Sequence, residues 1–250
     1  MKHIFITFAT KNAKNIDVHH KTIHNAGLRL QNQAKDINLF DECILYNEEF
    51  LQENEEFWNK HNEFVEKNRK GYGFYIWKPY VIKKTMEKMN DGDILLYLDA
   101  GCEIDSTKAN EMNKLIDQVK KEKIVGGGTG MSEGQFTKKD LFIKLNLYNK
   151  ECFHSMQHQG GTNFFLVCDE TRNLVNEWYN LACDYKNIDE SRSTSDIPDI
   201  KSHIIIHQHR HDQSIFSLLT KKYKIFSFGL NENKAIRVHR NRSGISRINN

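Results

Sequence analysis

The chain has 250 residues, with 36 Lys and Arg against 33 Asp and Glu, so its formal net charge is +3 when His is neutral. A charge so close to zero points to no nucleic-acid partner and to no membrane surface. Hydrophobic residues make up 38% of the chain and only 2 residues are Pro, which excludes a disordered or fibrous protein. We expect a single domain over residues 1–250, because α/β enzymes of about this length often form one unit.

No stretch approaches the roughly 20 apolar residues of a membrane helix, so we expect no integral membrane segment. The apolar start Met1–Phe8 is too short for a secretion signal, which favours a soluble cytoplasmic protein. The five cysteines are widely spaced, odd in number and without a Cys-x-x-Cys pair. We therefore expect reduced thiols, mostly in the core, rather than a disulfide framework or a cysteine zinc site.

The first hundred residues alternate short apolar runs with amphipathic segments. The runs predict strands at Ile4–Ala9, Cys43–Tyr46 and Ile94–Leu98. Between them we expect a loop at Thr10–His20, a helix at Thr22–Ala34, one or two helices in Glu48–Lys67 and a helix at Tyr80–Met89 with Pro79 in its first turn. Such an alternation of strands and helices predicts a parallel sheet.

The remainder continues the pattern with more irregular spacing. We expect helices at Lys108–Lys121, Thr171–Tyr185 and His211–Leu219, and strands at Ile124–Val125, Thr162–Val167, Tyr223–Phe228 and Ala235–His239. The glycine run Gly126–Gly130 predicts a flexible loop, Gly160-Gly161 a turn before its strand, and Asn187–Lys201 a surface loop. The predicted fold is α/β, with a mixed, mainly parallel, Rossmann-like sheet flanked by helices.

Asp99 stands directly after the most apolar of the predicted strands. Ligands of open α/β sheets bind beyond the carboxyl ends of the strands, so this carboxylate lies where chemistry is expected. Asp also commonly caps a turn such as Ala100-Gly101, and position alone leaves both interpretations open.

Two stretches, Gly71–Pro79 and Gly92–Ile104, resemble a group of nucleotide-sugar-dependent glycosyltransferases with the GT-A fold. Members of that group carry a Tyr-Leu-Asp-x-Asp element here, and this chain has Tyr97-Leu98-Asp99-Ala100-Gly101. Further similar features, in the same order, are the strand Ile4–Phe8, the pair Gly160-Gly161, the helix start His211–Ser214 and the late His239–Arg242. The likeness implies a GT-A-like domain that transfers a sugar from a UDP- or GDP-sugar to a hydroxyl of a glycan, as in polysaccharide synthesis.

The resemblance also implies roles for individual residues. It places the donor against Thr7, Lys78, Tyr97, Asp99, Gly101, Arg240 and Arg242, and the acceptor or transferred sugar against Gly161, Asn163 and His211. The resemblance also implies that Asp99 and Asp212 are the catalytic carboxylates. Asp212 is a general base if the reaction inverts the anomeric centre, or an anchor for a sugar hydroxyl if it retains it.

Family members use the two Asp residues of the element for a divalent metal and the ribose, which implies Mn²⁺ or Mg²⁺ held here by Asp99 and His239. This chain departs from the pattern, because Gly101 stands in place of the second Asp and Glu103 is the nearest substitute. Without a metal, Lys78 and the C-terminal arginines would have to offset the phosphate charge.

Each motif also has an ordinary structural interpretation. Lys78 can be a solvated residue beside a core Trp77, Gly160-Gly161 a tight turn, and Asp212 a helix cap. The alternating His207, His209 and His211 suggest zinc, although the helix that follows breaks their alignment.

Two other functions remain open, namely a non-catalytic nucleotide- or carbohydrate-binding module and a nucleic-acid binder that uses the basic C-terminus. Segments 126–134 and 187–201 are candidates for a lid that closes over the donor and excludes water.

Overall fold

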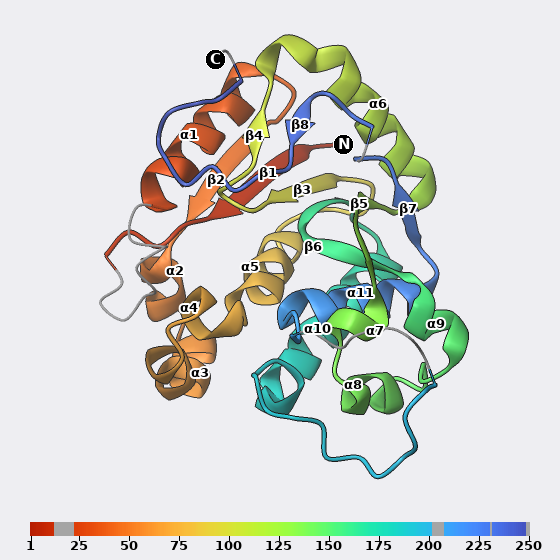
Figure 1. The fold of residues 1–250 in the computed structure, drawn as a ribbon. Helices are drawn as coiled ribbons and strands as arrows, with labels where there is room; N and C mark the ends of the chain where they lie inside the picture. Colours follow the sequence, from red (N-terminus) through yellow and green to blue (C-terminus); the bar gives the residue numbers. More distant parts are fainter. Residues whose placement is uncertain (13–22, 202–207, 231, 249–250) are drawn as a thin grey trace.

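The computed structural model describes residues 1–12, 23–201, 208–230 and 232–248. Most of the predicted loop Thr10–His20, the predicted helix start Thr22 and His207 of the histidine run lie outside these residues. The structure is a twisted sheet with helices on both faces (Figure 1). The predicted fold class is confirmed.

The central sheet has six strands in the order β2-β1-β3-β6-β5-β7. Their bounds are β1 His3–Phe8, β2 Glu42–Tyr46, β3 Ile94–Leu98, β5 Ile124–Ser132, β6 Met156–Leu166 and β7 Phe226–Phe228. Strand β1 pairs in parallel with β2 and β3, and β5 pairs in parallel with β7. Strand β6 runs antiparallel between β3 and β5, so the sheet is mixed.

Eleven α-helices and a small second sheet surround these strands within the described ranges. The helices are α1 Ile23–Asp36, α2 Glu48–Glu53, α3 Glu55–Lys67, α4 Gly71–Phe74, α5 Trp77–Met86, α6 Ala109–Glu122, α7 Glu133–Phe136, α8 Lys139–Lys144, α9 Lys150–His154, α10 Asp169–Cys183 and α11 Asp212–Tyr223. The second sheet pairs β4 Glu103–Ile104 with β8 Ile236–Arg237. Helix α5 begins before the predicted Tyr80 and has Pro79 in its first turn, where a missing N–H costs nothing.

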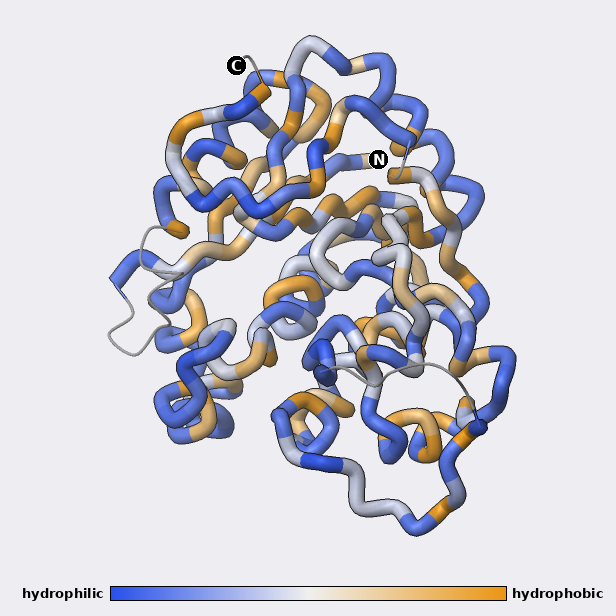
Figure 2. Tube along the Cα trace, viewed as in Figure 1, coloured by the Kyte–Doolittle hydropathy of each residue, from blue (hydrophilic) through white to orange (hydrophobic). Residues whose placement is uncertain are grey.

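The sheet separates two hydrophobic cores because successive side chains of a strand point to opposite faces. Along β3, Leu95 and Tyr97 belong to the core with α5, α10 and α11, whereas Leu96 and Leu98 belong to the core with α1 and α6. The tube of Figure 2 is hydrophobic along β3 at the centre of the molecule. The alternation continues to Asp99, which follows Tyr97 on the α5 side.

The predicted strand Tyr223–Phe228 begins only at Phe226, because α11 extends to Tyr223. Two predictions for glycine segments are also wrong. The glycine run is part of β5 rather than a flexible loop, and Gly160-Gly161 lie inside β6 rather than before it. A Cβ on Gly126 would overlap the Asn163 side chain, so this glycine lets a neighbouring side chain cross the strand. Backbone pairing between β5 and β6 defines both strands here, and no apolar alternation marks it in the sequence.

The predicted surface loop, residues 187–201, is tied to the structure around α8. The Lys138 ammonium lies 2.6 Å from Asp189 Oδ1, and Asp140 Oδ2 accepts a 2.8 Å hydrogen bond from the Thr194 amide. These contacts hold the loop down in the conformation described.

Among the described residues, no helix combines the length and the apolar character needed to cross a bilayer. All five cysteines are free thiols, as expected, but only Cys102 and Cys152 are buried. Burial raises the pKa of both thiols, so they are protonated at neutral pH.

Candidate active site

Three charged side chains from distant parts of the chain meet at the carboxyl end of β3. Lys78 Nζ lies 3.2 Å from Asp99 Oδ1 and 3.0 Å from Asp212 Oδ2. The side chains of Lys78 and Asp212 are each 4% exposed, whereas that of Asp99 is 50% exposed. The cluster therefore has one buried ion pair, Lys78 with Asp212, and one carboxylate, Asp99, that faces solvent at the sheet edge where ligands of α/β proteins bind.

Tyr97, in the buried part of β3, holds the Asp99 carboxylate in place. Its hydroxyl donates a 2.7 Å hydrogen bond to Asp99 Oδ1, and its side chain is fully buried. The Lys78 ammonium lies 5.4 Å from the ring centre of Tyr97 and 5.3 Å from that of Tyr75. Tyr97 thus contacts both charged groups, and Tyr75 supplies the second aromatic wall. The contact of Tyr97 with a donor stays a prediction.

Strained backbone brings Lys78 to this position. All five residues of Gly71–Tyr75 have positive φ, between 53° and 83°. Three of them are not glycine, and each such conformation costs about 1–3 kcal/mol. The indole of Trp77 stacks on Phe8 at 3.8 Å and donates to the Gly71 carbonyl, which locks the turn and starts α5 with Lys78 as its second residue.

A second strained residue precedes Asp212. His211 has φ 52°, its ring stacks on Phe74 at 4.7 Å, and its Nδ1 lies 2.8 Å from the Ile188 carbonyl oxygen. Burial lowers the pKa of His211 to about 4, so the imidazole is neutral. These contacts hold the start of α11, where Asp212 is the first residue. The contact of His211 with an acceptor, which the resemblance implies, stays a prediction.

Burial raises the pKa of Asp212 to about 6, against the opposing effect of the Lys78 ammonium. In Lys78, burial alone would lower the pKa, but the two carboxylates outweigh it and raise the value. Lys78 is therefore a permanent cation, and Asp212 is a carboxylate whose pKa lies close to neutral pH. Such a group is suited to proton transfer.

The two glycines of β6 make room for the cluster. A Cβ on Gly161 would overlap the Asp99 carboxylate, and a Cβ on Gly160 would lie 3.1 Å from Gln213 Cα. The first glycine lets Asp99 lie against the sheet and the second lets the start of α11 approach it. Both glycines thus make room for groups of the protein itself, Gly161 for the Asp99 carboxylate and Gly160 for the start of α11.

Replacing Gly161 by Ala should displace Asp99 and destabilise the fold by about 1–3 kcal/mol, the usual range for overpacking. Thermal or urea unfolding measures this cost. In an Asp99→Ala background the overlap is gone, so the same Gly161→Ala change should cost less than about 0.5 kcal/mol. Equal costs in the two backgrounds would contradict this explanation of Gly161.

Two predicted site residues are not part of the exposed cluster. Asn163 is fully buried in β6, where its Nδ2 donates to the Gln159 carbonyl at 3.0 Å. Thr7 is also fully buried, and by alternation along β1 it belongs to the same face as Phe5, in the core with α1 and α6. Both lie in the sheet beneath the cluster, and neither side chain is open to a ligand.

A C-terminal strap, residues 238–248, passes beside Gly101. The Asn241 amide donates to the Gly101 carbonyl at 3.0 Å. A Cβ on Gly101 would lie 3.2 Å from the His239 carbonyl oxygen and 3.3 Å from Arg240 Cα. The backbone of the strap thus occupies the side of Gly101 where a second aspartate would project.

Glu103 anchors the strap. Its fully buried carboxylate accepts hydrogen bonds from four groups of the strap, namely His239 Nε2, Asn241 Nδ2, Ser246 Oγ and the Arg247 amide. Burial alone would raise its pKa, but the hydrogen bonds, from Ser246 and Asn241 foremost, lower it to about 2. Glu103 and His239 bind each other, and their carboxylate and imidazole are engaged in holding the strap.

Arg29 adds a second anchor that sequence reasoning missed. One terminal nitrogen donates to the carbonyls of Ala100 and Cys102 at 3.1 and 2.8 Å, and the other donates to the Asn241 carbonyl at 3.1 Å. The guanidinium thus joins α1, the segment after β3 and the strap. In the sequence it is one polar residue of an amphipathic helix and carries no signal of this role.

The residues around Asp99 do not form a good site for Mn²⁺ or Mg²⁺. Hard divalent cations need several oxygen ligands, and within the described ranges no three His, Cys, Asp or Glu side chains are grouped so as to hold a metal. Asp99 Oδ1 is shared between Lys78 and Tyr97, and Glu103 is saturated by the strap. The Lys78 ammonium lies between the two carboxylates, where it compensates their charge.

Two arginines flank the cluster. Arg240 lies on the strap beside Gly101, and Arg210 lies two residues before Asp212. The Arg210 guanidinium stacks over the Phe136 ring at 4.2 Å. Both arginines are exposed, and in the part of the chain that the structure describes neither has a carboxylate partner. Arg210 was not selected as a site residue from the sequence, because the histidines around it suggested zinc. Arg242 was predicted to bind the donor, but none of its described contacts is with the cluster.

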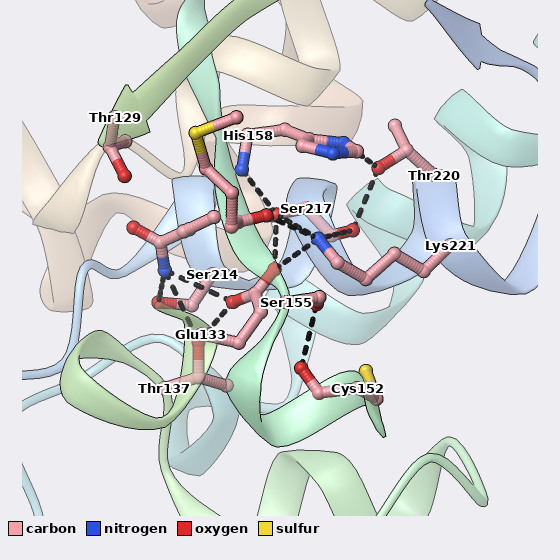
Figure 3. Close-up of polar contacts among 12 residues, drawn as sticks. Thr129, Glu133, Thr137, Cys152, Ser155, His158, Ser214, Ser217, Thr220 and Lys221 are labelled. Atoms are coloured by element: carbon pink, nitrogen blue, oxygen red, sulfur yellow. Dashed lines mark hydrogen bonds and ion pairs between the residues drawn. The ribbon is translucent and has the colours of Figure 1, made fainter. Parts of the chain in front are cut away.

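A buried polar network fixes α11 from its other side (Figure 3). Glu133 is fully buried and lies 2.7 Å from Lys221 Nζ, with a further hydrogen bond from Ser217. Gln157 donates to Glu133 and accepts a 2.7 Å hydrogen bond from Gln213, the residue after Asp212. The network joins α7, β6 and α11. It has no motif in the sequence.

No family model matches the sequence, and no curated protein sequence is significantly similar to it. Solved structures with a related arrangement include mouse xyloside xylosyltransferase 1 in its apo form, at 12% identity and a TM-score of 0.44 over 91% of this chain and 84% of that one. The bifunctional IspDF of Campylobacter jejuni has 9% identity and a TM-score of 0.39 over 71% of this chain. This chain covers 44% of the length of IspDF.

A third similar structure is the 4-diphosphocytidyl-2C-methyl-D-erythritol synthase of Anaerococcus prevotii, at 13% identity and a TM-score of 0.36 over 96% of this chain and 94% of that one. All three likenesses are remote. The chemistry of the site therefore has to be inferred from its own residues.

Proposed function

We propose that this chain is a glycosyltransferase that moves a sugar from a nucleotide-sugar donor to an acceptor hydroxyl. One observation carries the proposal, namely the cluster in which Lys78 joins the exposed Asp99 to the buried Asp212 at the carboxyl end of β3. The resemblance of Tyr97–Gly101 to the Tyr-Leu-Asp-x-Asp element supports the choice of donor. A glycan acceptor is proposed on the same resemblance.

The proposed step balances with these groups alone. The acceptor oxygen forms a bond to the anomeric carbon of the sugar, and the bond from that carbon to the diphosphate oxygen breaks with its electron pair. The nucleoside diphosphate leaves, and the acceptor proton passes to Asp212, whose pKa of about 6 leaves it ionised and receptive at neutral pH. Asp99, the exposed carboxylate, orients the donor.

A panel of UDP- and GDP-sugars tests the proposal. We expect at least one donor to raise the melting temperature, and the same donor to release nucleoside diphosphate with an acceptor or, more slowly, with water. Asp99→Ala should lose the thermal shift because it removes the carboxylate that faces the donor. A thermal shift without any nucleotide release would instead favour the non-catalytic binding module.

The stereochemistry of the product separates two roles of Asp212. Inversion at the anomeric carbon agrees with Asp212 as a general base, and retention would make it an anchor for a sugar hydroxyl. Proton NMR of the fresh product distinguishes the two outcomes by the anomeric coupling. Binding of nucleic acid that weakens steeply with salt would favour the third candidate function.

A further inference from the structure

We propose that Arg210 and Arg240 form a diphosphate clamp that binds the donor without a divalent metal. This inference rests on the proposed function and deepens it, because it assigns the recognition of the leaving group. It replaces the Mn²⁺ or Mg²⁺ implied by the resemblance with guanidinium groups of the protein itself.

The first step of the argument is steric. A second aspartate of the usual element would project from the position of Gly101, but there the strap backbone lies within 3.3 Å of a Cβ. The strap is held in that position by Glu103 and Arg29, both buried and both hydrogen-bonded to several groups. The space for a second carboxylate ligand is thus filled by a segment with many anchors.

The second step is electrostatic. Asp99 and Asp212 already have a cation between them, since the buried Lys78 ammonium lies within 3.2 Å of both. A metal at Asp99 would lie close to this permanent positive charge and be repelled by it. The remaining candidate ligand, His239, is bound to Glu103 at 2.9 Å.

The third step is the pair of arginines. The backbone of Arg240 lies beside Gly101 in the strap, and Arg210 precedes Asp212 by two residues, with its guanidinium 4.2 Å from the centre of the Phe136 ring. Gly101 follows Asp99 by two residues in the chain, so each arginine is next to one of the two carboxylates that Lys78 joins. Burial and, after it, the charge of Arg240 lower the pKa of Arg210. Like charges brought together without carboxylate partners in the described chain form a natural site for an anion, and planar guanidinium groups match phosphate oxygens in a bidentate manner.

The charges of the site agree with this assignment. Two carboxylates, one ammonium and two guanidiniums leave one net positive charge facing a leaving group that gains negative charge as the sugar departs. The clamp stabilises that developing charge where a metal would otherwise do so.

Isothermal titration of the full chain in EDTA tests the clamp, with inorganic diphosphate, UDP and GDP as probes. We expect diphosphate and at least one nucleotide to bind in EDTA with little change when Mn²⁺ replaces the chelator. Arg210→Ala and Arg240→Ala should each weaken binding at least about tenfold, and Arg210→Lys should weaken it less because it keeps the charge. Arg237→Ala, at an exposed arginine of β8, is the matched control and should bind as the wild type does.

The outcomes separate the two proposals. Binding that requires Mn²⁺ or Mg²⁺, or that is unchanged in both arginine variants, overturns the clamp and leaves the transferase proposal standing. No binding of any probe under either condition also overturns the clamp. Arginine-dependent binding in EDTA with no release of nucleotide from any donor supports the clamp and contradicts the transferase.

Discussion

Asp212→Asn is expected to lower kcat by about 10²- to 10⁴-fold, the usual contribution of a general base. The amide cannot accept the acceptor proton. We expect the wild type to have an acid limb in its pH–rate profile near pH 6, the pKa of Asp212, and the variant to lose it. Donor binding should weaken less than kcat, because the exposed Asp99 and the flanking arginines remain. Initial rates from pH 5 to 8 measure these effects.

The same substitution leaves the buried Lys78 with one carboxylate in place of two. Removing one partner of a buried ion pair costs about 3–5 kcal/mol, so unfolding must be measured beside the rates. Asp117→Asn, at an exposed residue of α6, controls for the change of residue type. A folded Asp212→Asn variant with wild-type kcat and an unchanged acid limb would show that Asp212 is not the base.

Acidification from pH 7 to pH 5 is expected to reduce the free energy of unfolding by several kcal/mol. Burial lowers the pKa of four histidines, to about 4 for His61 and His211 and to about 3 for His158 and His209. Between pH 6.5 and those values the unfolded chain binds protons that the folded protein does not, so stability is lost as the pH falls. Each histidine contributes about 2 kcal/mol over this interval.

Asp212 acts in the opposite direction. Its folded pKa of about 6 lies above the ordinary value, so between those values the folded protein binds the extra proton and gains stability as the pH falls. This offset is about 1 kcal/mol at pH 5. Urea unfolding at each pH measures the net loss.

His61→Gln isolates one of these contributions. His61 is fully buried between the hydroxyls of Tyr179 and Tyr185, at 3.0 and 2.9 Å, and glutamine can form hydrogen bonds there without titrating. Below pH 6.5, the free energy of unfolding of the variant should fall less steeply with pH than that of the wild type, by about 1.4 kcal/mol per pH unit. Asn113→Gln, at an exposed residue of α6 that does not titrate, is the control and should keep the wild-type slope. Equal slopes for wild type and His61→Gln would mean that His61 is not held neutral.

The strands and long helices followed directly from local pattern. The apolar run Ile94–Leu98 and the spacing of Thr171–Tyr185 are sufficient to identify β3 and α10, because burial on a sheet or a helix face requires that periodicity. The glycine-rich β5 and the first half of β6 lack it. Their structure comes from hydrogen bonds to each other, which the sequence does not express as a pattern.

The site divides in a similar way. Asp99, Lys78 and Asp212 could be selected from sequence because they lie at the end of a strong strand or near a helix start, and because their motifs resemble a known family. Arg210, Arg29 and Glu133 could not, since each acts through a contact with a residue far away in the chain.

The sequence by itself determined the α/β fold class, and with the resemblance it indicated the carboxylates at the sheet edge. Only the tertiary structure decided what surrounds them. It placed the Lys78 ammonium between Asp99 and Asp212, filled the space beside Gly101 with the C-terminal strap, and packed the Asp99 carboxylate against Gly161. The reason is physical. Periodicity and turn residues record local conformation, whereas the charge and free space of a site depend on segments that only folding brings together.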